Sequence, residues 1–192
     1  MITLASRETE ENSKGQSNVS ELDETWNIVL AEAERRARQS GENSVADYLS
    51  LRQANDLARQ TGLRWLWDTF RGLVGEANRV GAGVNLVKTE PHRFAVGAAT
   101  MVGTQWNFSY GVRSLIIAAG WPRAPGDGFV RGGGLACGQI RHFGMTAANE
   151  ELLLMHGPRQ APQWLSQTDD NRLLSFPEQR ARWHVGKFLG VN

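Results

Sequence analysis

The stretch "RVGAGVNLVKTE", residues 79–90, divides the sequence into two parts of different texture. Before it, apolar residues recur at helical spacing, and Leu66 and Phe70 lie in the strongest apolar stripe of the chain. After it, short runs rich in β-formers and glycine lack helical periodicity. We therefore predict an α+β fold in which helices over about 20–80 pack on a coiled antiparallel sheet or partial barrel over about 84–190.

Glycine and cap residues subdivide the helical part. Gly41 is placed to end a first helix, and Ser44 is placed to begin a second. Gly62 either breaks that second helix or is absorbed into a longer one. Residues 1–18 are polar and predict a flexible tail, which leaves residues 19–192 as a single α+β domain.

The stretch "GWPRAPGDGFVRGGGLACG", residues 120–138, is rich in glycine. Because Pro fixes φ and Gly accepts a positive φ, "PGDG" predicts a hairpin turn between strands at 116–120 and 128–130. The glycines of "RGGGLACG" either bind a phosphate through their backbone N–H groups or lie in a strand, where they permit coiling or a bulge. The strand is favoured because no complete phosphate-loop motif is present.

The C-terminal third fits more than one structure. "PQWLSQ" at 162–167 and "RLLSF" at 172–176 fit strands or short helices. "PEQRARWHVGKFLG" at 177–190 fits a helix that starts at Pro177, or a segment that ends as a strand.

Trp65 and Trp67 are separated by two positions in the helical part. On a helix these positions point about 200° apart, so the two rings cannot face the same core. One of them is expected to face a second surface, which indicates an oligomer or partner contact.

Composition restricts the class of protein. The chain has 192 residues, a net charge of +1 and an ordinary apolar fraction of 41%. Cys137 is the only cysteine, which favours a reducing compartment, and we expect a cytoplasmic, bacterial-type protein. No apolar run is long enough to span a membrane, so no membrane partner is expected.

Residues 91–149 are strongly basic because Asp127 is their only acid. Arginine forms bidentate contacts with carboxylate and phosphate and stacks on rings. We therefore predict that this region attracts a small anionic ligand or an acidic partner. The expected ligand-binding residues are Arg113, Arg123, Arg131, Arg141 and Trp121.

Catalytic motifs are weak throughout. Asp127 and His142 are the best candidates for acid–base catalysis, although Asp127 also fits simple turn chemistry. "NFSYG" at 107–111 partly matches a nucleophile elbow, but its strand–turn–helix context is missing. The histidines lack metal-ligand spacing, so no metal site and no cofactor are predicted.

Three functions remain open. The leading hypothesis is a non-catalytic cytoplasmic domain that binds a partner protein or a small anionic ligand and forms a homo-oligomer. One alternative is a small enzyme with its site near Asp127, Arg131 and His142. The other is binding of RNA or single-stranded DNA through arginines and aromatic rings on the sheet.

Overall fold

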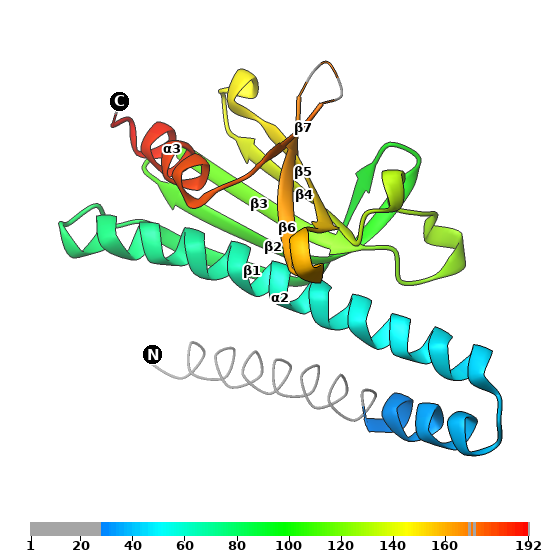
Figure 1. The fold of residues 1–192 in the computed structure, drawn as a ribbon. Coiled ribbons are helices and arrows are strands. Elements are labelled where there is room, and N and C mark those ends of the chain that lie inside the picture. Colours follow the sequence, from blue (N-terminus) through cyan, green and yellow to red (C-terminus); the bar gives the residue numbers. More distant parts are fainter. Residues whose placement is uncertain (1–27, 169, 171, 192) are drawn as a thin grey trace, which may run out of the picture. The chain divides into compact units, whose positions relative to one another are not determined.

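A computed structural model describes residues 28–168, 170 and 172–191. The predicted tail, residues 1–18, lies outside these residues. The chain divides into two compact units, residues 1–56 and 57–192. Helices and a seven-stranded antiparallel sheet that is not closed make up an α+β fold, as the sequence predicted (Figure 1).

The described part of the first unit is helical. Residues 28–39 form a helix, and Gly41, whose φ is +80°, lies in the turn that follows it. The predicted helix end is therefore confirmed. Leu30, Ala37 and Ala46 are buried, whereas Val45 and other neighbouring apolar residues are exposed.

Helix α2 (Asn43–Arg79) continues through Gly62, so the longer-helix alternative is correct. In the second unit, Leu66 and Phe70 of the apolar stripe are fully buried in the main core. Gly62 faces the sheet closely, because its carbonyl accepts a hydrogen bond of 2.8 Å from the Trp164 indole. At the end of α2, the Asn78 side chain donates to the Val84 carbonyl and accepts from the Val84 N–H. These two hydrogen bonds fix the turn that leads into the sheet.

The sheet is a simple meander in which each strand pairs with the next, from β1 to β7 (Figure 1). All pairs are antiparallel. Alternation along each strand places one row of side chains in the main core, under α2 and α3, and the other row on the opposite face. The strands are β1 (Asn85–Val96), β2 (Ala99–Tyr110), β3 (Arg113–Trp121), β4 (Ala136–His142), β5 (Glu150–His156), β6 (Pro162–Gln167) and β7 (Leu173–Ser175).

The glycine-rich stretch departs from the predicted hairpin. "PGDG" does form a turn, but residues 128–130 are not a strand, and β3 pairs instead with β4. Between them, Arg131–Gly133 forms a second 3-10 turn in which Gly132 and Gly133 have positive φ. A strand needs extended backbone, so only the last part of "RGGGLACG", from Ala136 onward, enters the sheet.

The C-terminal alternatives are also resolved. The segments at 162–167 and 172–176 supply β6 and β7, and Glu178–Leu189 forms helix α3, with Pro177 at its N-cap. The expectation that the last segment ends as a strand is therefore wrong. Phe188, on the inner face of α3, is buried in the main core. Among the helices of the described residues, none has the length and apolar character needed to cross a bilayer.

Candidate functional site

Asp127 is the centre of a small ion cluster at one end of the sheet. It is buried, and its Oδ2 accepts backbone N–H bonds from Arg123 (3.1 Å) and Ala124 (3.0 Å). Its Oδ1 accepts a 2.6 Å bond from the guanidinium of Arg93. The bond from the Arg123 backbone and the nearby Arg93 charge lower the pKa of Asp127. This carboxylate closes the turn that it belongs to, which supports its interpretation as a turn residue.

Three of the predicted ligand-binding residues lie at this end. Trp121 is buried, and the guanidinium of Arg123 lies 3.8 Å from the centre of its ring. The Arg131 side chain lies against Gly97, in the turn between β1 and β2.

Arg113 and Arg141 lie at the opposite end of β3. Arg141 pairs with Ile116 on β3, and its side chain bonds Glu151 at 2.9 Å. Arg113 begins β3 and donates to the Phe188 carbonyl at 3.4 Å. The predicted arginines therefore divide between two ends of the sheet, which weakens the case for one anion or nucleic-acid site.

Asp127 and His142 are likewise separated. His142 pairs with Leu115, six residues before Trp121 on β3, and Asp127 lies beyond Trp121. At about 3.3 Å per residue, about 20 Å of strand separates the two positions. The structure does not bring Asp127, Arg131 and His142 together.

His142 instead belongs to a buried hydrogen-bonded network of polar side chains. Its Nε2 lies 2.9 Å from His184 Nδ1, and His184 Nε2 lies 2.7 Å from Glu150 Oε2. The guanidinium of Arg180 donates to the same Glu150 oxygen at 2.8 Å. β4, β5 and α3 each contribute a side chain to this network, so only the folded tertiary structure assembles it.

The direction of each hydrogen bond follows from the ionised state of Glu150. Burial by itself would raise the pKa of Glu150, but its interactions with His184, Ser166 and Arg180 lower it to about 2. An ionised carboxylate only accepts, so His184 Nε2 donates to Glu150. In neutral rings, His184 Nδ1 then accepts from His142 Nε2.

Two atoms of this network lack a hydrogen-bond partner among the described residues. They are His142 Nδ1 and Glu150 Oε1, and both are buried. Burial, together with the neighbouring His184, lowers the pKa of His142 to about 4, so its ring is neutral at neutral pH. A buried acceptor without a donor is costly, which makes both atoms candidates for contact with another molecule.

A pocket of about 490 Å³ opens beside Glu150, between the first turn of α3 and the end of the sheet. Glu150 lines this pocket, whereas His142 does not. Hydroxyls, an amide, a guanidinium and an indole surround the carboxylate. The lining residues are Glu150, Ser166, Thr168, Leu174, Ser175, Pro177, Gln179, Arg180 and Trp183.

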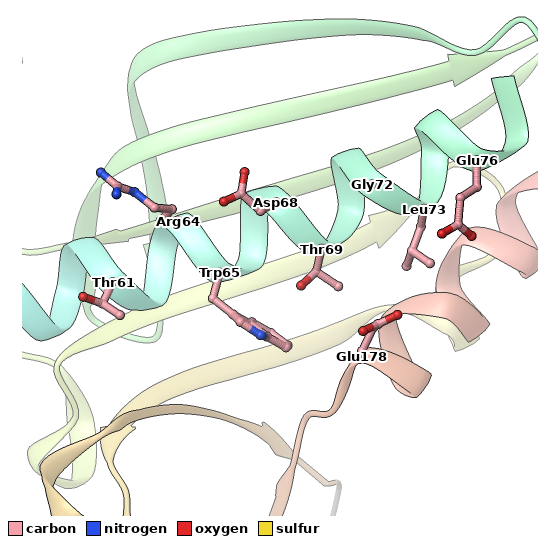
Figure 2. A pocket seen from close by; sticks show the side chains of 9 residues that line it. All are labelled: Thr61, Arg64, Trp65, Asp68, Thr69, Gly72, Leu73, Glu76 and Glu178. Carbon is pink, nitrogen blue, oxygen red and sulfur yellow. The ribbon is translucent and has the colours of Figure 1, made fainter. Parts of the chain in front are cut away.

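A second pocket, of about 520 Å³, lies between α2 and α3 (Figure 2). Trp65 extends into it from α2, and its ring meets Phe176 edge-on at 6.5 Å. Trp67 points the other way and stacks on Trp106 in the core at 5.4 Å. The prediction that the two tryptophans face different surfaces is confirmed.

The other candidate reactive residues, Ser109 and Cys137, have structural roles in the sheet. Ser109 lies near the end of β2, where it pairs with Asn85 and Ser114, and not on a strand-to-helix turn. Cys137 is buried, and this burial raises the pKa of its thiol to about 11. Within the part of the chain that the structure describes, no group of three or more His, Cys, Asp or Glu side chains is arranged to hold a metal ion.

The sequence reasoning missed Glu150, His184 and Arg180. A usable signal existed in "EELLLMH", because Glu150 alternates with Leu152 and Leu154. Glu151 alternates with Leu153 in the same way on the other face of the strand. Period-two alternation alone therefore does not say which of the two acids is buried.

The chain matches no family model, no curated protein and no solved structure.

Proposed function

We propose that this chain is a non-catalytic cytoplasmic domain that binds a small polar ligand in the pocket beside Glu150. One observation carries the proposal: Glu150 Oε1 is a buried carboxylate oxygen with no partner among the described residues, and Glu150 lines an open pocket. The oxygen lacks a hydrogen-bond donor, and we expect a ligand bound in this pocket to supply one.

The charge of the pocket restricts the ligand. Arg180 neutralises Glu150 at one oxygen, and the other oxygen still presents a partial negative charge. A small anion, which the arginine-rich sequence favoured, is repelled at this oxygen. The pocket therefore fits a neutral or cationic donor, such as a hydroxyl, amide or ammonium group.

The surrounding residues support binding more than chemistry. Ser166, Thr168 and Gln179 add hydroxyl and amide groups that can both donate and accept. His142 has a pKa near 4 and does not line the pocket, which makes it a poor general base for a ligand held there. A reducing compartment agrees with the single buried thiol of Cys137.

A thermal-shift screen of the full chain tests this proposal. The panel contains neutral and cationic donors (glucose, glycinamide and ethanolamine) and anions (phosphate, sulfate and citrate). We expect a donor to raise the melting temperature and the anions to have no effect through this site. Isothermal titration then measures affinity for any stabilising compound.

The variant Glu150→Gln keeps the shape of the side chain and removes its charge. It should weaken binding of the stabilising donor about tenfold, because the charged acceptor is lost. Glu151→Gln is the matched control, since Glu151 lies on the other face and bonds Arg141. Ser166→Ala is a second, milder test in case Glu150→Gln unfolds. Equal binding by all three variants, or no stabilising donor, would contradict the proposal.

A further inference from the structure

The Glu150 pocket presents a hydrogen-bond acceptor and a hydrogen-bond donor side by side. Arg180 Nε donates to Glu150 Oε2 at 2.8 Å, which brings the two side chains together and leaves Glu150 Oε1 without a partner among the described residues. This bond from Nε is also the only hydrogen bond that the Arg180 side chain makes with the described residues. The terminal N–H groups of its guanidinium therefore remain to donate, beside an oxygen that only accepts.

The guanidinium of Arg180 is held in place by an aromatic ring. Its Cζ lies 4.3 Å from the centre of the Trp183 ring, and both side chains line the pocket. Lys187 also approaches this ring, with Nζ 5.8 Å from its centre, but Lys187 does not line the pocket. Because stacking and the bond to Glu150 both fix the guanidinium, little side-chain freedom is lost when a ligand accepts from it.

Further polar groups are distributed around the pocket. Ser175 Oγ accepts from Gln163 Nε2 at 2.9 Å, so its own O–H remains to donate. The exposed amide of Gln179, in the first turn of α3, can both donate and accept. Thr168 is less available, because its hydroxyl donates to the Arg172 carbonyl at 3.0 Å. A ligand therefore meets donors and acceptors on several sides of a pocket of about 490 Å³.

The ionisable groups of the pocket cancel in charge. Glu150 and Arg180 are the only residues with ionisable side chains among the described residues that line it. A cationic ligand at Glu150 Oε1 lies beside the guanidinium, and an anionic ligand at the guanidinium lies beside Glu150 Oε1. Each meets a like charge at short range, whereas a neutral ligand meets none.

We propose that the ligand of the Glu150 pocket is a neutral polyhydroxylated molecule, a sugar or a cyclic polyol. This inference rests on the proposed function and narrows its ligand class. A hydroxyl donates to Glu150 Oε1 and accepts from Arg180, and its neighbours on the same ring reach Ser175 and Gln179. A single amide supplies one such group, whereas a polyol supplies several around a ring, as the distribution of polar groups requires.

Isothermal titration of the full chain tests the ligand class. The probes are glucose, mannose and myo-inositol as polyols, acetamide as a neutral amide, and ethanolamine as a cation. We expect a polyol to bind, and acetamide and ethanolamine to bind about tenfold more weakly or worse, because they make fewer bonds or meet a like charge. The affinity for the polyol should not change as salt rises, since the ligand carries no charge to be screened.

Two variants test the assigned contacts. Arg180→Lys keeps the positive charge beside Glu150 but loses the planar guanidinium, and it should weaken binding of the polyol about tenfold. Arg182→Lys is the matched control, because Arg182 bonds Glu76 and Glu178, which do not line this pocket. Gln179→Ala changes an exposed side chain and should weaken binding about threefold, which provides a test even if Arg180→Lys unfolds.

The outcomes separate this inference from the proposed function. If ethanolamine or acetamide binds as tightly as every polyol, the pocket binds a donor but the polyol assignment is wrong. If no probe binds, the polyol assignment and the proposed function both fail. Polyol binding that Gln179→Ala and a folded Arg180→Lys leave unchanged would also overturn the inference, and if Arg180→Lys unfolds, an unchanged affinity in Gln179→Ala overturns it alone.

Discussion

The buried His142 ring should make folding stability depend on pH. In the folded protein burial and the neighbouring His184 lower the pKa of His142 from 6.5 to about 4. Between these values the unfolded chain holds a proton that the folded chain lacks, so stability rises with pH. The contribution is complete above pH 6.5 and is lost progressively as pH falls from 6.5 to about 4. At about 1.4 kcal/mol per unit, the total is about 3 kcal/mol.

Glu150 and Arg180, the charged groups that His184 links to His142, do not titrate in this window. Glu150 has a pKa of about 2 in the folded protein, below its ordinary value of 4.5, so its own contribution to stability is lost only at lower pH. Between pH 6.5 and 4.5, the ionised Glu150 and the guanidinium of Arg180 keep their charges. A decline in stability across this window that is removed by replacing His142 therefore reports on the His142 ring.

Urea denaturation followed by tryptophan fluorescence measures the effect. From pH about 6.5 to about 5, the free energy of unfolding should fall by about 2 kcal/mol. His142→Gln, which cannot titrate, should lose most of this slope, whatever its stability at neutral pH. His156→Gln changes an exposed histidine and should keep the slope. An unchanged slope in His142→Gln would refute the assignment.

The remaining predictions concern packing and reactivity. Gly62→Ala should lower the free energy of unfolding, measured in urea, by about 1–3 kcal/mol, because the new Cβ would lie 2.6 Å from Leu154 Cδ1. Gly72→Ala is the control: its Cβ would meet no atom within 4 Å, so this variant should stabilise α2 by about 0.5–1 kcal/mol. Trp164→Phe should cost about 1–3 kcal/mol, since the Gly62 carbonyl loses its buried donor, and differential scanning calorimetry should show a lower melting temperature. Cys137 should react with a thiol reagent at neutral pH only after unfolding, because it is buried and its pKa is about 11; rapid modification of the native protein would contradict this.

Local sequence signals predicted the elements well where one physical cause dominated. The stripe containing Leu66 and Phe70 specified a buried helix because helical spacing gathers those side chains on one face. The stretch "RVGAG" marked the boundary because Gly81 and Gly83 adopt positive φ there. Trp65 and Trp67 diverged as the helix geometry requires.

The signals failed where two local structures were similar in energy. A glycine such as Gly62 breaks an isolated helix, but packing against Leu154 and Trp164 keeps α2 continuous. "PGDG" correctly predicted a turn, yet the strand partner of β3 begins only at Ala136, because positive φ at Gly132 and Gly133 excludes extended backbone.

The sequence by itself determined the α+β class, with helices before strands, and that the two tryptophans of α2 face different surfaces, since these follow from periodicity along the chain. Only the tertiary structure decided which residues form sites. His142 lies 42 positions from His184 and meets Glu150 through it. Strand register and helix docking fix such contacts, and neither is encoded in local spacing.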